Sequence, residues 1–97
     1  MLNYQHGTVG SRWDVPSELA GGYELAALFG GMGYATAAPD FLGLGEARGL
    51  HPYVHSETEA RAAIDMLYAT RQYADENNNL ALNDQVFVTG YSQGGHA

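Results

Sequence analysis

The sequence contains no cysteine among its 97 residues. This absence excludes a disulfide framework and a thiolate metal site, but it leaves the cellular compartment open, since many exported bacterial proteins also lack cysteine. Basic residues are few as well, with 4 Lys and Arg against 11 Asp and Glu, for a formal net charge of −7. Phosphate backbones and anionic membrane surfaces repel such a chain, so we do not expect nucleic acid as a partner.

Long apolar runs are also missing. No segment is apolar for long enough to span a bilayer, and a strand-like segment follows Met1 too closely for a signal peptide to fit. We therefore expect a soluble chain with no transmembrane segment. The length and the 45% content of hydrophobic residues are those of one small globular domain, which we assign to residues 1–97.

Strand-like and helical patterns alternate along the chain. Residues 2–5 form a short extended run that stops at His6-Gly7, and residues 34–38 and 86–89 are short, largely apolar runs bounded by glycine or proline; together they predict three strands. The last run does not alternate with polar residues, as expected of a strand covered on both faces. Helices are predicted over residues 16–29 and 56–74.

Each predicted helix has a start and an apolar face. The first has Pro16 near its first turn and Gly30-Gly31 at its end, although Gly21-Gly22 weakens it. The second begins at Ser56-Glu57-Thr58-Glu59, which has the pattern of a capping box. The expected apolar faces are Leu25, Leu28 and Phe29 in the first helix, and Ala60, Ala63, Ile64, Leu67 and Tyr68 in the second.

The alternation predicts a three-layer α/β fold, in which two crossover helices cover a parallel sheet. The carboxyl ends of parallel strands lie at one edge, where open α/β sheets bind ligands. The segments that meet there are His6-Gly7-Thr8, Pro39-Asp40 and Gly90-Tyr91-Ser92. One site at that edge is expected.

The segment from Gly90 to Gly94 matches the pattern G-x-S-x-G directly after a predicted strand. In a nucleophile elbow the turn is so tight that Gly90 and Gly94 are needed, and Ser92 is held in a strained conformation with its hydroxyl exposed. The pattern alone also fits a glycine-rich turn. Its place after a strand favours Ser92 as a nucleophile.

The His6-Gly7-Thr8 segment suggests an oxyanion hole. Gly7 would allow close approach of the backbone, so that the amides of Thr8 and Gln93 could bind the oxygen of a tetrahedral intermediate. A simple strand-ending turn is the alternative for this segment. The elbow beside it favours the oxyanion hole.

Four ordered motifs together resemble bacterial α/β-hydrolases related to secretory lipases and prolyl-oligopeptidase-like esterases. The motifs cover nearly the whole chain: Tyr4-Gln5-His6-Gly7-Thr8, Pro39-Asp40-Phe41-Leu42-Gly43-Leu44-Gly45, His51-Pro52-Tyr53-Val54-His55 and Gly90-Tyr91-Ser92-Gln93-Gly94-Gly95-His96. The resemblance implies that the strands are the third to fifth of that fold, with the first of them between the other two. It also implies that no cofactor is needed, and it favours a secreted or periplasmic parent protein.

In this family the triad order is serine, acid, histidine, and only five residues follow Ser92. We therefore interpret residues 1–97 as a partial catalytic domain, truncated at both ends, whose triad acid and histidine are missing. The expected function of the parent is a lipase or esterase acting on small-molecule or lipid esters. A peptidase, an acyltransferase and a non-catalytic binding module of the same fold stay as alternatives, and the oligomeric state is open.

Four other residues could suggest different chemistry. Asp40 is acidic and lies at a strand end, but the family pattern gives it a role in shaping the loop that follows. His51 and His55 have the spacing of a helical metal pair, yet Pro52 and the absence of H-E-x-x-H favour loop packing or pocket lining. His96 is expected to point into the protein, one helical turn after Ser92.

Overall fold

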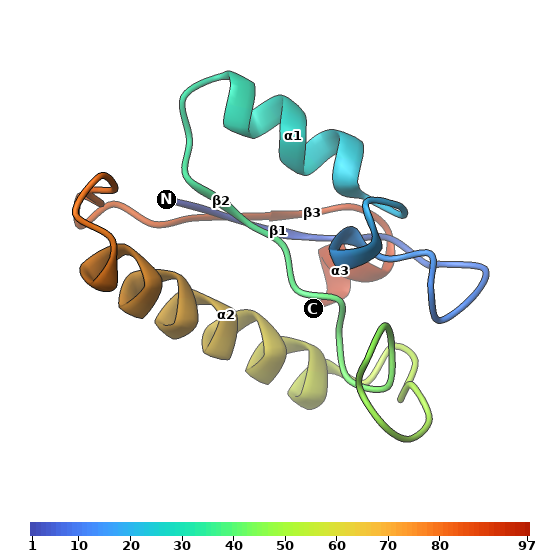
Figure 1. Ribbon diagram of the computed structural model, residues 1–97. Helices are drawn as coiled ribbons and strands as arrows, with labels where there is room; N and C mark the ends of the chain where they lie inside the picture. Colours follow the sequence, from blue (N-terminus) through green and yellow to red (C-terminus); the bar gives the residue numbers. More distant parts are fainter.

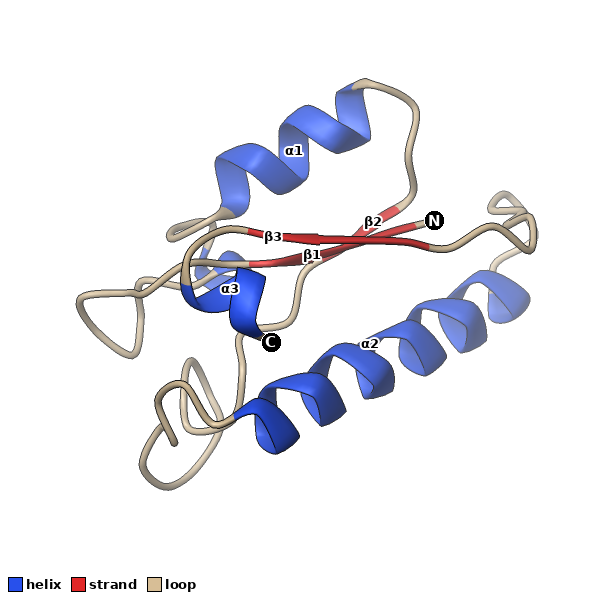
Figure 2. Ribbon diagram, turned by 180° about the vertical axis from the view of Figure 1, so that it is seen from behind, coloured by secondary structure: helices blue, strands red, loops and turns tan.

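In the computed structural model, which describes residues 1–97, three strands form one parallel sheet. The sheet order is β2 (Thr36–Ala37), β1 (Leu2–Gln5), β3 (Phe87–Gly90), so β1 pairs with both other strands. The helices α1 (Tyr23–Gly31) and α2 (Ser56–Glu76) cover opposite faces of the sheet (Figures 1 and 2). The predicted α/β class, the parallel sheet and the central place of the first strand are confirmed.

The central strand β1 is buried along its whole length. Successive side chains of a strand point to opposite faces, and β1 uses this alternation to contact both helices. On one face the ring of Tyr4 lies 6.0 Å from that of Phe29 in α1. On the other face Asn3 Nδ2 donates a hydrogen bond of 2.7 Å to the carbonyl oxygen of Ala63 in α2.

The first predicted helix is divided in the structure. A short 3₁₀ turn, η1 (Pro16–Glu18), comes first, and α1 begins only after Gly22, whose φ is +89°. That left-handed backbone favours glycine and interrupts the helix, so the prediction of one helix over residues 16–29 is wrong. Its predicted apolar face is also only partly used, because Leu25 and Leu28 are 40% and 57% exposed.

The second predicted helix begins where expected but is capped and oriented differently. The N-cap of α2 is His55, and Thr58 Oγ1 donates to the His55 carbonyl oxygen at 3.1 Å, so the predicted capping box does not form. Ile64 and Tyr68 are 49% and 70% exposed. The sheet beneath α2 is only three strands wide, and the buried residues of this helix are Glu59, Ala63 and Ala74.

The two outer strands also differ from expectation. β2 is shorter than the predicted strand over residues 34–38, and β3 begins and ends one residue later than predicted. We expected this last strand to be covered on both faces, but all its residues are exposed, because β3 lies at the edge and pairs with β1 alone. No helix has the length and apolar character needed to cross a membrane.

A small apolar cluster lies near the carboxyl ends of the strands. It consists of Val15, Phe41 and Leu44, all nearly completely buried. These residues come from the loop after β1 and the loop after β2. The cluster therefore fixes the two loops that surround the elbow.

Candidate active site

Ser92 lies at the turn between β3 and the short helix α3 (Gln93–His96). Its φ of 54° and ψ of −114° lie outside the regions that side-chain-bearing residues ordinarily occupy. The residue is exposed, and although it is the N-cap of α3 its side chain makes no capping hydrogen bond. Serine is thus held in a strained turn with its hydroxyl toward solvent, the arrangement expected of a nucleophile elbow.

The two glycines of the G-x-S-x-G pattern lie against other backbone segments. A Cβ on Gly90 would overlap the carbonyl group of Gly94, and a Cβ on Gly94 would overlap the carbonyl group of Gln5. The turn is closed by hydrogen bonds from Gly94 N to Tyr91 O at 2.9 Å and from Tyr91 N to Gln5 O at 3.2 Å. The end of β1 therefore supports the elbow directly.

Gly7, just after β1, lies beside the candidate nucleophile. A Cβ built on Gly7 would be 3.6 Å from the Cβ of Ser92 and 3.0 Å from the Tyr91 ring. The next residue, Thr8, and the residue after the nucleophile, Gln93, are the candidate oxyanion donors. Neither of their backbone amides donates a turn, loop or cap hydrogen bond within the chain.

His6 fixes the segment that carries Gly7 and Thr8. The imidazole is fully buried, with Nε2 2.8 Å from the carbonyl oxygen of Asp40 and Nδ1 2.6 Å from that of Gly7. Its ring also lies 4.5 Å from the ring of Phe41. His6 thus joins the ends of β1 and β2, and its two ring nitrogens have backbone partners.

A group of buried polar side chains surrounds Gln93, and the sequence did not indicate it. Gln93 is 4% exposed, and its Nε2 lies 2.6 Å from Glu59 Oε1 in α2 and 2.7 Å from His51 Nε2. Glu59 is itself 1% exposed. Sequence reasoning placed Glu59 in the capping box, although its position four residues before buried Ala63 put it on the same helical face.

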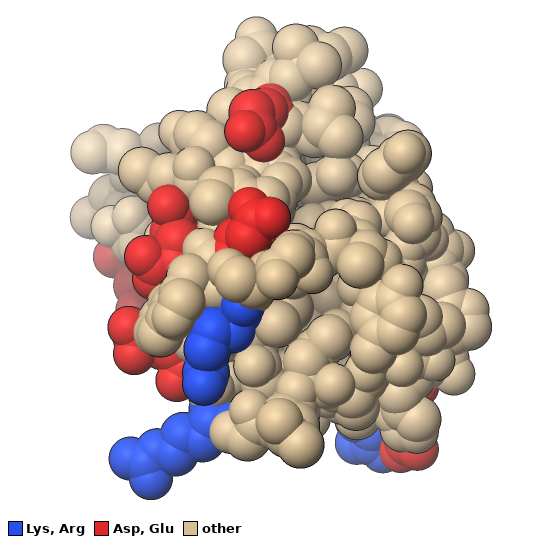
Figure 3. Space-filling view, turned by 90° about the vertical axis from the view of Figure 1, so that its right-hand side faces the viewer, with Lys and Arg blue, Asp and Glu red and all other residues tan.

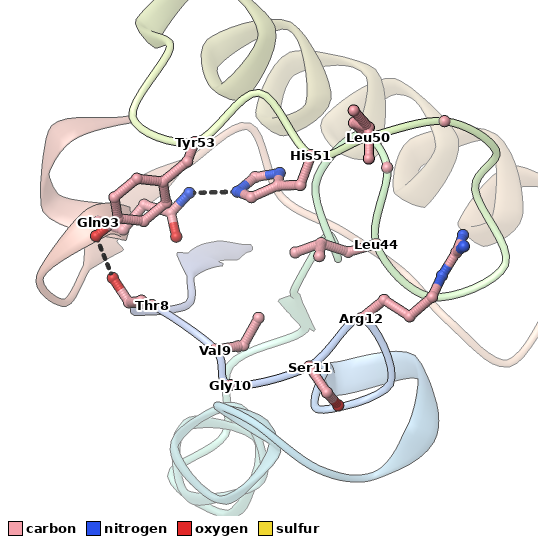
Figure 4. A pocket seen from close by; sticks show the side chains of 12 residues that line it. Thr8, Val9, Gly10, Ser11, Arg12, Leu44, Leu50, His51, Tyr53 and Gln93 are labelled. Carbon is pink, nitrogen blue, oxygen red and sulfur yellow. Dashed lines mark hydrogen bonds between the residues drawn. The ribbon is translucent and has the colours of Figure 1, made fainter.

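A pocket of about 330 Å³ opens next to this group (Figure 4). Thr8 and Gln93 lie at one end, and Thr8 Oγ1 is 2.8 Å from the Tyr53 hydroxyl. Arg12 extends toward the loop after β2, where it donates to the carbonyl oxygens of Gly45 and Ala47. The pocket is lined by Thr8, Val9, Gly10, Ser11, Arg12, Gly43, Leu44, Gly49, Leu50, His51, Tyr53 and Gln93.

Comparison with known proteins identifies a solved structure that resembles this chain. No family model matches the sequence, and no curated protein matches it. The crystal structure of a protein from Legionella pneumophila, described as a "putative hydrolase", matches with a TM-score of 0.90 and 42% sequence identity. The match covers 99% of this chain and 26% of that protein.

The chain has a hydrolase-like fold. It spans about a quarter of the length of the Legionella protein, so the match concerns the region around the elbow and the loops described above. It is consistent with the resemblance indicated by the sequence motifs, and it supports a hydrolase at a general level.

Two other residues considered in the sequence analysis, Asp40 and His96, have their places fixed by the structure. Asp40 Oδ1 and Oδ2 accept hydrogen bonds from the backbone and hydroxyl of Ser17, at 3.0 and 2.5 Å, and the carboxylate lies against Gly45. Asp40 therefore shapes the loop after β2. His96 was expected to point into the protein, but it is exposed at the end of α3, a single turn whose buried residues are Gln93 and Gly94.

The histidines of the third motif do not form a metal site. His51 lines the pocket, one of the two roles expected for it, and His55 is the residue at the N-cap position of α2, with Nδ1 3.2 Å from Thr58 Oγ1. No cluster of three His, Cys, Asp or Glu side chains is arranged to hold a metal ion.

Tyr4, in the central strand β1, has a shifted pKa. Burial raises the pKa of Tyr4 above its ordinary value of 10.0, and the nearby charge of Glu24 and the Tyr91 phenol add to the effect. The phenol is therefore neutral throughout the physiological range. Tyr4 belongs to the packing between β1 and α1.

Proposed function

We propose that this chain carries the nucleophile and the oxyanion donors of a serine hydrolase that acts on carboxylic esters. The observation on which the proposal depends is the conformation of Ser92. A non-glycine residue in such a backbone conformation costs of the order of 1–3 kcal/mol and persists mainly at functional sites. The strained turn exposes the Ser92 hydroxyl beside Gly7, where it can attack the carbonyl carbon of a substrate.

The oxyanion hole is proposed at the backbone amides of Thr8 and Gln93. Both amides are without a hydrogen-bond partner in the turns and loops of the chain, and the adjacent Gly7 lies next to Ser92. Amides fixed in this way stabilise the negative charge that develops only in the tetrahedral intermediate. Loss of one such donor typically costs about 3 to 4 kcal/mol of transition-state stabilisation.

The chemistry follows from these positions. Ser92 Oγ attacks the ester carbonyl carbon while a histidine accepts its proton, and the carbonyl oxygen becomes the oxyanion. Collapse of this intermediate releases the alcohol, which takes the proton from the histidine. Water then hydrolyses the acyl-enzyme by the same steps and regenerates Ser92.

The histidine and its acid are proposed to lie outside residues 1–97. Both ring nitrogens of buried His6 lie within hydrogen-bond distance of backbone carbonyl oxygens, and His51 is joined to Gln93. His55 lies at the N-cap position of α2 beside Thr58, and His96 lies at the end of α3. The Legionella protein is about four times the length of the matched region, which leaves ample polypeptide for the two remaining triad residues.

The surroundings of the site favour an uncharged substrate. Seen from the carboxyl ends of the strands, most of the surface is uncharged; most charged side chains lie on the left of the view, with a further basic and acidic group at the lower right (Figure 3). The cationic group of Arg12 in the pocket is already joined to two carbonyl oxygens. These features fit a neutral ester better than an anionic substrate.

A fluorophosphonate probe tests this proposal on the full-length protein that contains these residues. We expect covalent labelling at Ser92, identified by peptide mass spectrometry, and complete loss of labelling in Ser92→Ala. Folded wild-type protein that is not labelled would instead indicate a binding module without turnover. Labelling at a different serine would also overturn the assignment.

A further inference from the structure

The side chain of Gln93 is buried and makes two hydrogen bonds, although Gln93 lies in a helix of a single turn. We propose that Glu59 and His51 are positioning residues, which bind the side-chain amide of Gln93 and thereby aim its backbone N–H at the oxyanion. This inference rests on the proposed function. It assigns a role in catalysis to two residues that neither touch the substrate nor belong to the triad.

The first argument is the geometry around the Gln93 amide nitrogen. Its two N–H groups have two acceptors, Glu59 Oε1 at 2.6 Å and His51 Nε2 at 2.7 Å. A primary amide has two donors, so both are used. The acceptors come from α2 and from the loop before it. Gln93 is therefore held by residues 34 and 42 positions earlier in the sequence.

The second argument is that His51 is itself fixed. Its Nδ1 is 2.9 Å from the carbonyl oxygen of Leu42, which can only accept, so Nδ1 carries the proton and Nε2 is the acceptor toward Gln93. The imidazole also stacks on the ring of Phe41, with an angle of 7° between the planes. Because Phe41 belongs to the apolar cluster, packing in that cluster fixes the direction of the hydrogen bond between Gln93 and His51.

The third argument is the unusual environment of Glu59. This carboxylate is 1% exposed, its Oε2 has no hydrogen-bond partner, and no salt bridge reaches it. Burying a carboxylate with so few partners lowers stability, and replacing a buried polar pair by apolar residues of similar volume often stabilises a protein. The position of Glu59 is therefore better explained by what it binds than by a contribution to folding.

The fourth argument is that Gln93 carries the buried side chain of α3. The helix is a single turn, the two residues after Gln93 are glycines, and His96 is exposed. The backbone of Gly94 packs on the end of β1 and Ala97 packs on the apolar cluster, while the side-chain amide of Gln93 links this turn to α2 and to the loop before it. A displacement of about 1 Å at a reacting group can cost roughly 100-fold in rate, so loss of the attachment should affect the adjacent amide.

The test compares three variants in the full-length protein, with hydrolysis of a p-nitrophenyl ester as the assay. Glu59→Leu removes the acceptor but suits a buried position, Glu59→Gln keeps an acceptor oxygen, and Gln93→Met keeps the backbone amide but removes its attachment. We expect Glu59→Leu and Gln93→Met to lower kcat by roughly 10- to 100-fold with KM nearly unchanged, since the oxyanion donor acts in the transition state.

Three readouts separate positioning from a general structural role. Glu59→Gln should keep kcat within about threefold of wild type. The double variant Glu59→Leu/Gln93→Met should be no slower than either single variant, and its thermal midpoint should be no lower than that of Glu59→Leu, because removing both partners leaves no buried amide N–H of Gln93 without an acceptor. Wild-type kcat in both single variants would overturn the inference, as would an equal loss in Glu59→Gln and Glu59→Leu.

The outcome is distinguishable from a failure of the proposed function. Absence of probe labelling at Ser92 in the wild-type protein refutes the hydrolase itself. Normal labelling and turnover with unchanged kcat in the variants refutes only the positioning role. If Glu59→Leu does not fold, Gln93→Met decides the question by the same kcat and KM criterion.

Discussion

Gly94 in α3 and Gly30 in α1 both lie within helices, but their surroundings are very different. A Cβ on Gly94 would overlap the backbone carbonyl of Gln5, whereas a Cβ on Gly30 in α1 would meet no atom within 4 Å. The first glycine is required by close approach of two backbone segments. The second has no such requirement in the structure.

We therefore expect opposite effects from the same substitution at these two positions. Gly94→Ala should destabilise the protein by about 3 kcal/mol or more, because backbone must move to accommodate the methyl group. Gly30→Ala should stabilise it by about 0.5–1 kcal/mol, since alanine loses less conformational entropy in a helix. Urea unfolding of both variants measures the difference, and equal midpoints would contradict the proposed fit at the elbow.

At the scale of elements, polar side chains attach α2 to the central strand. Asn3 Nδ2 donates to the Ala63 carbonyl oxygen, and Asn3 Oδ1 accepts from Gln5 Nε2 at 2.8 Å. Both Asn3 and Gln5 are buried. The contact between β1 and α2 therefore depends on hydrogen bonds as well as on apolar packing.

Asn3→Leu should lower stability even though it adds an apolar side chain to a buried position. The variant leaves Gln5 Nε2 without its acceptor in the interior, which typically costs about 1–3 kcal/mol. Chemical unfolding would show this loss, with Asn78→Ala as the matched control, because Asn78 is exposed and should change stability by less than about 0.5 kcal/mol. A neutral effect of Asn3→Leu would show that another acceptor replaces Asn3.

The order and type of the elements could be predicted from the sequence, whereas their buried faces could not. Residues 2–5 form a strand as predicted, and α1 ends at Gly31, two residues beyond the predicted end. The break at Gly22 depends on a left-handed backbone, which a helical pattern does not reveal. The apolar pattern of α2 pointed to Ile64 and Tyr68, but three strands offer too narrow a surface to bury them.

The candidate site was predictable in its backbone and not in its supporting side chains. The motif around Ser92 indicated the strained turn after β3, because local sequence determines such turns, and the roles of Ser92 and of the segment after β1 stay predictions. The link between Gln93 and Glu59 joins residues 34 positions apart. It depends on how α2 lies across the sheet, so no local pattern carries it.

At the scale of the whole molecule, the chain holds part of the proposed catalytic apparatus. The proposed nucleophile, the candidate oxyanion donors and the pocket are present, whereas the histidine that accepts the proton is proposed to lie outside residues 1–97. The outer strand β3 exposes Val88 and Phe87, at 65% and 47%. Both features agree with a match to about a quarter of a larger hydrolase.

We expect residues 1–97 alone to show at most trace esterase activity. Loss of the general base from a serine triad lowers turnover by roughly 10⁶-fold. Release of p-nitrophenol by the isolated chain, compared with its Ser92→Ala variant and with the full-length protein, measures this. Turnover equal to that of the full-length protein would show that the chain contains its own base.

The backbone of Ser92 has a consequence for protein engineering. Glycine adopts a φ of 54° and a ψ of −114° more readily than serine does, so Ser92→Gly should relax the turn while removing the attacking oxygen. Thermal tolerance and turnover are therefore opposed at this position. A library screened only for heat resistance would tend to lose the very residue on which hydrolysis depends, and screening must include an activity selection to retain it.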